Sequence, residues 1–410
     1  MFVSPPSSGI SGLLDADHGQ EAPLRFRTMN DLLGLEPTPE HAAQELEEQL
    51  LLASESEPAS FEEAQSSEEW RLAMLDEMTG TGSHRLVVGV YVDDLVITGG
   101  DSHDIDLFKE EMKATFKMSD LGLLRYYLGL EVSQTNEGIT ICQSAYAAKI
   151  LENAGLSGCN PSDTPMESRL KLSKLSSAPT VDATMYRSIV GSLRYLVNSR
   201  PDLAYSVGYV SRFMENPTVE HLVAVKRVLR YIAGTLHFGC YYQRKKDALL
   251  EGYSDSDLAG DVDTRKSTSG VFFFLGSSII TWQSQKQKVV ALSSCEAEYI
   301  AAATAACQGV WLARLLAELK GEKIRAFTLS MDSQSAIQLS KNPVFHDRSK
   351  HIDVRYHFIR DCVEQRRVKL KFMGTAEELA DILTKALGRD RFRELCSRIG
   401  VIDVQNMCKV

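Results

Sequence analysis

The chain has 410 residues, 44% of them hydrophobic, and its 45 lysines and arginines against 55 aspartates and glutamates give a formal net charge of -10. This composition is typical of a globular protein large enough for two or three domains, and it excludes a collagen, a coiled-coil rod and a small disulfide scaffold. Residues 1–80 contain seventeen acidic and three basic residues, so the rest of the chain carries a net charge of +4. Most of the chain can therefore face a nucleic-acid backbone.

Cysteine usage and hydropathy bear on the compartment. The eight cysteines form no CxxC pair and show no zinc-type spacing with histidine, which indicates reduced thiols in an intracellular protein. The N-terminus lacks the basic and apolar segments of a signal peptide, and the apolar runs are far shorter than a membrane span. The sequence thus predicts an intracellular protein without a membrane segment.

The first third of the chain contains a tail and a hairpin. Residues 1–58 are rich in Ser, Pro and Glu and are predicted to be a disordered acidic leader. The segment RLVVGVYVDDLVITGG predicts a β-hairpin whose tip presents Asp93 and Asp94. The elements expected after it are a helix at 104–116, strands at 127–133 and 138–142, and a helix ending near residue 155.

A Ser/Pro linker at 159–181 leads to three predicted helices, at 183–198, 201–215 and 219–234. The third helix shows Lys226, Arg227 and Arg230 on one side. This basic face is a candidate nucleic-acid contact, and the more common alternative is a solvated helix face.

From residue 249 the pattern changes. The expected elements are a strand at 252–254, a hairpin at 270–282, a helix at 294–319, a strand at 326–331, two helices, a strand at 368–373 and a helix at 376–387. A hairpin followed by alternating helices and strands predicts an α/β domain. Within it, Arg265 and Lys266 either contact a nucleic-acid backbone or line the surface.

Several motifs in fixed order carry a resemblance: YVDDLVITG, FKMSDLGLLRYYLGLEV, GYSDSDLAG, ALSSCEAEYIA and ELADILTKAL. Over residues 60–387 the chain resembles the C-terminal part of the polyprotein of copia-type LTR retrotransposons, a reverse transcriptase followed by ribonuclease H. The resemblance implies an α/β fold: an α+β palm remnant with helical thumb and connection at 59–248, a ribonuclease H-like mixed-sheet α/β domain at 249–390, and a C-terminal tail at 391–410. It also implies RNA, DNA and RNA–DNA hybrid as partners, no membrane, and a cytoplasmic particle or the nucleus as the location.

Phosphodiester hydrolysis with two Mg²⁺ ions requires a cluster of carboxylates, and Mn²⁺ is a possible substitute. The resemblance assigns this role to Asp255, Glu298, Asp332 and Asp381. Asp257 would share the strand face with Asp255 and is the alternative first ligand.

Local spacing separates ligands from helix caps. Ser293 and Glu296 stand at capping-box spacing, which leaves Glu298 without a structural task. Asp332 follows a strand and opens a helix, where it could cap the helix or bind metal. Thr375 and Glu378 repeat the capping-box spacing and leave Asp381 as the fourth acid.

The polymerase portion is incomplete. The resemblance implies that Asp93, with Asp94 beside it, holds metal ions together with an aspartate from an earlier palm strand. The run SFEEAQSSEEWRLAMLDEM at 60–78 predicts a short helix that starts with a capping box of Ser60 and Glu63. Only residues 79–84 lie between this helix and the hairpin, and they leave no place for that strand. The sequence therefore predicts either an internal deletion or a spliced gene model, and in both cases a lost polymerase and a remaining nuclease. The alternative is a catalytically inactive nucleic-acid-binding remnant of a transposon.

Overall fold

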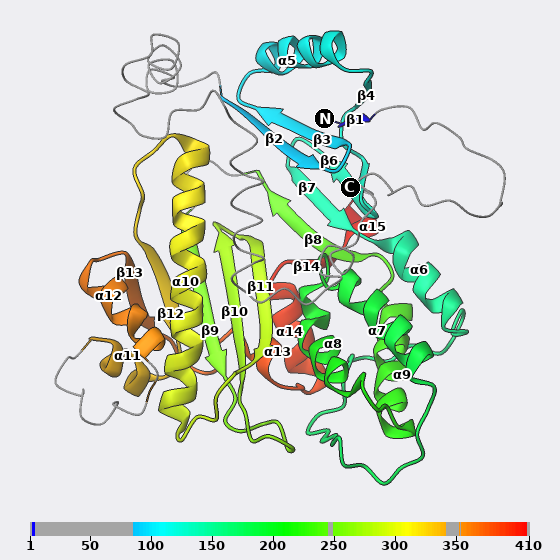
Figure 1. Cartoon of the computed structure of the whole chain (residues 1–410), viewed down its shortest axis with the longest axis vertical. Helices are drawn as coiled ribbons and strands as arrows, with labels where there is room; N and C mark the ends of the chain where they lie inside the picture. The colour runs from blue at the N-terminus through cyan, green and yellow to red at the C-terminus, as the bar shows by residue number, and fades with distance from the viewer. Residues whose placement is uncertain (1, 5–84, 245–248, 342–351, 353, 408–410) are drawn as a thin grey trace, which may run out of the picture. The chain divides into compact units, whose positions relative to one another are not determined.

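The computed structural model describes residues 2–4, 85–244, 249–341, 352 and 354–407 (Figure 1). The chain divides into two compact units, Met1–Gly122 and Leu123–Val410. The leader predicted at 1–58 lies outside the described residues except for Phe2–Ser4, which form a strand rather than part of a disordered tail.

The first unit is a four-stranded sheet with one helix. Its sheet order is β2-β3-β1-β4, and the hairpin predicted around the YVDD motif is β2 and β3. Leu95 and Ile97 of β3 are buried against apolar side chains of the helix. The elements are β1 (Phe2–Ser4), β2 (Leu86–Tyr91), β3 (Asp94–Gly99), α5 (Ser102–Thr115) and β4 (Ser119–Gly122).

The second unit begins with an antiparallel sheet and a group of helices. The strand predicted at 127–133 is divided in two, because Leu128 and Gly129 have φ of 49° and 76° and turn the chain back. The sheet order is β14-β8-β7-β6-β5. The elements up to residue 243 are β5 (Tyr126–Tyr127), β6 (Leu130–Gln134), β7 (Gly138–Cys142), α6 (Ser144–Asn153), α7 (Ala183–Leu196), η2 (Pro201–Leu203), α8 (Ala204–Val210), η3 (Ser211–Phe213), α9 (Val219–Ala233) and β8 (Phe238–Gln243).

A mixed five-stranded sheet follows in the same unit, in the order β11-β10-β9-β12-β13. β9, β10 and β11 run antiparallel, whereas β12 runs parallel to both β9 and β13. This is the mixed-sheet α/β arrangement expected for residues 249–390. The elements are β9 (Leu250–Ser256), β10 (Thr268–Leu275), β11 (Ser278–Lys286), α10 (Ser294–Lys320), β12 (Phe327–Met331), α11 (Gln334–Lys341), η5 (Val354–His357), α12 (Phe358–Glu364), β13 (Val368–Phe372), α13 (Asp381–Thr384), α14 (Arg389–Arg398), β14 (Val401–Asp403) and α15 (Val404–Met407).

Strand β10 lies between two hydrophobic cores. Side chains of successive strand residues point to opposite faces of a sheet. Phe272 and Phe274 accordingly join a core with residues of α7, α8, α9, α13 and α14, whereas Phe273 joins the core beneath α10. The sheet is therefore covered on both faces, and the helices between residues 183 and 233 form one of its two covering layers.

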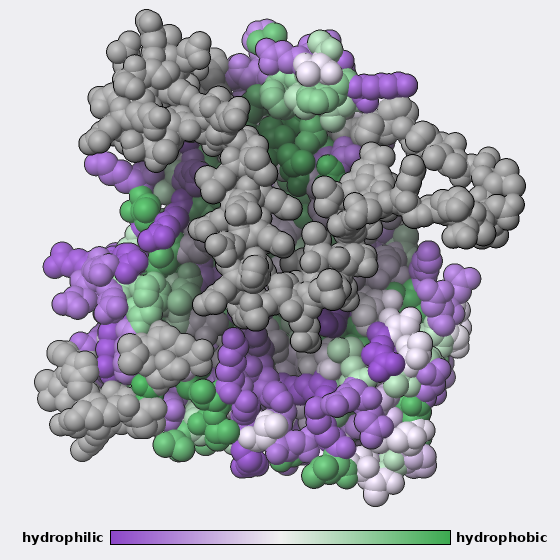
Figure 2. Space-filling view, in the orientation of Figure 1, coloured by the Kyte–Doolittle hydropathy of each residue, from purple (hydrophilic) through white to green (hydrophobic). Residues whose placement is uncertain are grey.

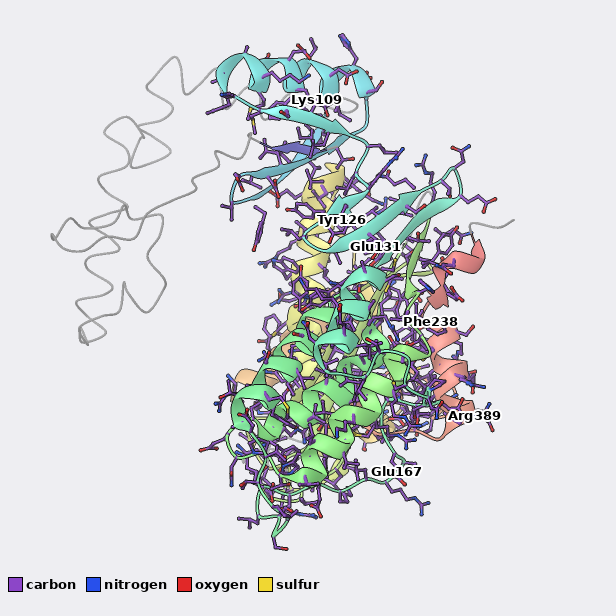
Figure 3. All side chains as sticks on the ribbon, turned by 90° about the vertical axis from the view of Figure 1, so that its right-hand side faces the viewer. Lys109, Tyr126, Glu131, Glu167, Phe238 and Arg389 are labelled. Carbon is purple, nitrogen blue, oxygen red and sulfur yellow. The ribbon has the colours of Figure 1, made fainter. Side chains whose placement is uncertain are left out.

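The residues predicted as a C-terminal tail, 391–410, are packed as far as the structure describes them. Phe392 and Leu395 of α14 are buried in the core that contains α7 and α9. β14 pairs antiparallel with β8, with Val401 opposite Cys240; Figure 3 labels Phe238 in β8 and Arg389 at the start of α14. The tail prediction is wrong because these short elements bury their apolar side chains against a distant part of the sequence.

The helix predicted at 376–387 is reduced to the four residues of α13. Arginines of α14 occupy the carbonyl groups that a longer helix would use. Arg398 donates to the Glu377 carbonyl at 3.0 Å, and Arg391 donates to the Glu378 carbonyl at 3.2 Å. Tertiary hydrogen bonds therefore replace the first helical turns.

Helix α10 begins where predicted, because the Ser293 hydroxyl accepts a hydrogen bond from the Glu296 N–H at 3.1 Å. It ends at Gly321, which has a φ of 64°. A side chain at Gly309 would place its Cβ 2.2 Å from Phe327, so the helix lies very close to the sheet. By length and composition α10 could also cross a bilayer, but half of its most apolar window is buried within the protein. We therefore describe it as a core helix.

Candidate metal centre

Three carboxylates from distant parts of the sequence converge at one end of the mixed sheet. Asp255 is near the end of β9, Glu298 lies in the second turn of α10 and Asp332 directly follows β12. One oxygen from each lies within 4.8 Å of the others. Because β9 and β12 are parallel neighbours, their carboxyl ends meet at the same edge of the sheet. Asp255 and Glu298 are buried, and Asp332 is half-buried.

Each of these carboxylates is held by a hydrogen bond from another segment. The donors are the Thr384 hydroxyl for Asp255, the Ser256 backbone N–H for Glu298 at 3.2 Å, and the Thr375 hydroxyl for Asp332 at 3.1 Å. These bonds fix the orientation of the oxygens, and none of the donors is a charged group. The capping box predicted for Thr375 and Glu378 is wrong, since the Glu378 N–H donates to the Thr375 carbonyl at 3.3 Å and not to the Thr375 hydroxyl.

The carboxylates repel one another and are poorly solvated. Burial, with Asp255 and Asp332 adding to it, raises the pKa of Glu298 to about 10. Burial is also the main reason why the pKa of Asp255 rises to about 6. Glu298 Oε2 is buried and has no hydrogen-bond partner among the described residues. A divalent cation would offset the repulsion and would give Glu298 Oε2 a partner.

The donor set fits a hard cation. All three groups offer carboxylate oxygen, and no thiolate or imidazole joins them among the residues that the structure describes. Mg²⁺ and Mn²⁺ prefer such ligands, whereas structural zinc sites use cysteine and histidine. The sequence-predicted residues Asp255, Glu298 and Asp332 therefore form a group whose ligand atoms suit a hard divalent cation.

Asp381, the predicted fourth ligand, stands beside this group. It is buried at the start of α13 and forms an ion pair with Lys385 at 2.5 Å. Burial alone would lower the pKa of Lys385, but the Asp255 and Asp381 carboxylates outweigh it and raise this pKa. Asp381 also contributes to the raised pKa of Asp255, so its charge acts on the centre.

Asp257, the alternative first ligand, has a structural contact instead. Its side chain accepts a hydrogen bond from the Thr268 backbone N–H. This bond closes the connection between β9 and β10. Between the two candidates, the structure brings Asp255 into the group of carboxylates.

Glu378 is a further acid of the site that the sequence analysis treated only as a cap. It is fully buried, and burial together with Asp255 and Asp332 raises its pKa well above the usual value. One oxygen accepts from the Ala380 N–H at 2.9 Å, and the other has no partner within the described residues. The segment EELAD at 377–381 contains three acids in five residues. Their spacing does not show which of them faces the site, and only their burial does.

Two of the three predicted nucleic-acid-binding residues on α9 hold a loop in place. Arg227 donates to the Thr164 hydroxyl at 3.0 Å, and Arg230 donates to the Asn160 carbonyl at 2.7 Å. Lys226 is exposed on the same helix. Much of the basic face therefore anchors the Ser/Pro linker.

Arg265 and Lys266 lie in the turn between β9 and β10. Arg265 is exposed with a φ of 56°, and Lys266 is half-buried. The turn is organised by Asp261, which accepts hydrogen bonds from the Thr264 N–H and hydroxyl at 2.8 Å. Despite burial, these bonds and Lys286 lower the pKa of Asp261 to about 2.

Asp93 and Asp94 lie at the tip of the β2–β3 hairpin, as predicted. Asp93 is exposed and Asp94 is half-buried. Neither belongs to a group of three or more His, Cys, Asp or Glu side chains that could hold a metal ion within the described ranges.

Comparisons with known proteins agree with the motifs. Residues 71–168 match the family described as reverse transcriptase (RNA-dependent DNA polymerase). The chain is 43% identical over 323 residues to the retrovirus-related Pol polyprotein from transposon TNT 1-94 of Nicotiana tabacum, covering 77% of this chain and 24% of that protein. It is 41% identical over 315 residues to the Pol polyprotein from transposon RE1 of Arabidopsis thaliana, covering 77% and 22%. The chain thus spans about a quarter of the length of these relatives.

A shorter relative is covered more fully. A putative transposon Ty5-1 protein of Saccharomyces cerevisiae is 34% identical over 225 residues, which is 54% of this chain and 73% of that protein. Among solved structures, the N-terminal RNase H domain of a Mycobacterium tuberculosis protein covers 37% of this chain and 98% of its own, at 15% identity and a TM-score of 0.25. From the sequence relatives and the order of its motifs, the chain belongs to the copia-type retrotransposon Pol polyprotein family, with a reverse transcriptase-family segment.

Proposed function

We propose that the second unit is a Mg²⁺-dependent nuclease that hydrolyses the RNA strand of RNA–DNA hybrids. The observation that supports this function is the convergence of Asp255, Glu298 and Asp332 within 4.8 Å at the edge of the mixed sheet. The choice of hybrid as substrate follows the resemblance of the surrounding motifs to ribonuclease H. The width of a hybrid's groove and its 2′-hydroxyls would supply selectivity.

In this proposal Asp255, Glu298 and Asp332 hold Mg²⁺, with Asp381 as the fourth acid. Bound Mg²⁺ supplies a Lewis acid that activates water and stabilises negative charge on phosphate oxygens. The chain's own contribution is orientation, since Thr384 and the Ser256 N–H fix two of the carboxylates before any cation binds. Lys385 balances the charge of Asp381.

The nucleic acid would lie along the surface around this edge. Figure 2 shows hydrophilic side chains gathered over the lower ends of β9, β10 and β11. Lys226, Arg265 and Lys266 remain candidates for backbone contacts, whereas Arg227 and Arg230 are engaged by the loop. We expect the protein to act inside the cell, in a cytoplasmic particle or in the nucleus.

We further propose that DNA synthesis is lost. Asp93 would need a second aspartate to hold the metal ions of a polymerase. Within the described residues of the first unit, no group of three or more His, Cys, Asp or Glu side chains is placed to bind a metal ion. Template-dependent primer extension by the purified chain would contradict this part of the proposal.

The nuclease proposal is tested with the purified full chain, Mg²⁺ and an end-labelled RNA–DNA hybrid. We expect cleavage of the RNA strand by the wild type and its loss in Asp332→Asn, which removes a charge with little change of shape. Glu215→Gln, at an exposed acid remote in sequence from the site, is the matched control and should cleave like the wild type. Hybrid binding without cleavage by the wild type would favour the alternative of an inactive binding remnant, and full cleavage by Asp332→Asn would refute the proposed centre.

A further inference from the structure

Gln287 is a buried amide next to the candidate metal centre. It directly follows β11, and 6% of its surface is exposed. Its backbone N–H donates to the Ser267 carbonyl at 2.7 Å, which fixes the chain at this point. The neighbouring Gln285, two residues earlier, is exposed. The two glutamines therefore have the same chemistry in different surroundings.

The side-chain nitrogen of Gln287 lies within hydrogen-bond distance of three acceptors on three elements. They are Ser256 Oγ of β9 at 3.1 Å, Ser269 Oγ of β10 at 3.0 Å and the Ala297 carbonyl of α10 at 2.9 Å. A primary amide has two hydrogens, so these contacts are shared. One side chain thus connects two strands of the sheet with the start of the helix that covers it.

Two of these contacts involve the chain neighbours of metal-site carboxylates. Ser256 follows Asp255, and its backbone N–H donates to Glu298 at 3.2 Å. Ala297 immediately precedes Glu298. The Gln287 amide therefore lies between the two backbone segments that carry Asp255 and Glu298.

We infer that Gln287 is a positioning residue, which holds β9 and α10 at the separation where Asp255 and Glu298 can share one cation. The inference rests on the proposed function of the centre. In the metal-free protein no cation draws the two carboxyl groups together, so the segments that carry them need a tie that does not depend on the cation. A neutral amide provides that tie and does not compete with the cation for the carboxylates, as a lysine ammonium would.

A packing role alone does not explain this residue. The Gln287 side-chain oxygen is buried and has no hydrogen-bond partner among the residues described. An unpartnered buried acceptor is unfavourable, and a leucine of similar size would fill the same space without it. Compared with leucine, glutamine at this position provides the three hydrogen-bond contacts of its side-chain nitrogen.

The test uses Gln287→Leu in the full chain. Mg²⁺ binding is measured by calorimetry and by the rise in unfolding temperature on Mg²⁺ addition, and hybrid cleavage is measured over a range of Mg²⁺ concentrations. We expect Mg²⁺ affinity to fall about 10- to 100-fold, as for other residues that orient metal ligands. KM for the hybrid at saturating Mg²⁺ should be unchanged. Gln285→Leu is the matched control and should bind Mg²⁺ like the wild type.

A second variant keeps the inference testable if Gln287→Leu does not fold. Ser269→Ala removes one acceptor of the amide and leaves both contacts beside the carboxylates, so a smaller loss of Mg²⁺ affinity is expected. If Gln287→Leu folds and binds Mg²⁺ as tightly as the wild type, the positioning role is overturned. If Gln287→Leu does not fold, unchanged Mg²⁺ affinity in Ser269→Ala overturns it. If Asp332→Asn binds Mg²⁺ as tightly as the wild type, the metal centre itself is wrong, which is a distinguishable result.

Discussion

Replacing Glu298 by glutamine should stabilise the metal-free protein while removing its response to Mg²⁺. The Glu298 carboxyl is buried, and its pKa is raised from 4.5 to about 10 by burial and by Asp255 and Asp332. In the folded protein at pH 7 it is therefore protonated, whereas in the unfolded chain it is ionised. Glutamine keeps the oxygen that accepts from the Ser256 N–H and carries no titrating group.

The magnitude follows from this difference in protonation. Between the ordinary pKa of 4.5 and pH 7, keeping Glu298 neutral costs the folded state roughly 3 kcal/mol as an upper bound. We expect Glu298→Gln to be about 1–3 kcal/mol more stable than the wild type at pH 7 in EDTA, since local relaxation reduces the full cost. Because the folded pKa is raised, the wild type loses stability as the pH rises above 4.5. The advantage of the variant should therefore vanish near pH 4.5.

The measurement is urea unfolding at pH 5 and pH 7, in EDTA and in excess Mg²⁺. Wild-type protein should gain about 2.7 kcal/mol when Mg²⁺ is present at a hundred times its dissociation constant. Glu298→Gln should gain much less, because a neutral amide is a poor ligand. A variant that is less stable than the wild type in EDTA at pH 7, or that keeps the full Mg²⁺ increment, would refute this reasoning.

Three further predictions concern stability and are read from urea unfolding. Asp202→Asn leaves the buried Arg200 guanidinium without its 2.7 Å carboxylate partner and should cost about 3–5 kcal/mol; a loss below 1 kcal/mol would contradict this. Gly309→Ala should destabilise by about 1–3 kcal/mol because its Cβ would overlap the sheet, whereas Gly191→Ala in open space should gain about 0.5–1 kcal/mol; equal effects would refute the close packing of α10. Since the Asp261 pKa is lowered to about 2, its stabilising effect is complete above 3.8 and is lost as the pH falls towards 2. Asp261→Asn should therefore be less stable than the wild type at pH 6, with a difference that shrinks below pH 3.8, and a pH-independent difference would contradict this.

Local patterns in the sequence were enough to place most strands and helices. The strand predicted at 138–142 is β7, and the capping serine predicted the start of α10. These elements are decided by alternation and capping, which depend on neighbouring residues. The helix at 376–387 could not be predicted correctly, because Arg391 and Arg398 occupy its carbonyl groups from a later helix.

The candidate site also contains residues that could be predicted from the sequence and residues that could not. Asp255, Glu298 and Asp332 could be predicted because the motifs around them resemble those of the retrotransposon family, and the structure brings the three together. Glu378 and Gln287 could not be identified as parts of the site. Their significance depends on burial and on contacts between segments far apart in sequence, which spacing does not encode.

Strand β10 contributes side chains to two cores, and this has a consequence for how copies of such a retrotransposon gene degrade. Phe272 and Phe274 face the helical layer, while Phe273 faces the layer of α10, so the edge with the candidate metal centre and the helices of residues 183–233 depend on the same strand. A copy that lost those helices would keep every acid of the metal centre in its reading frame and would still lose the surface on which β10 rests. Preserved acidic motifs alone are then insufficient to identify a copy with an intact fold, and the upstream helices must be considered with them.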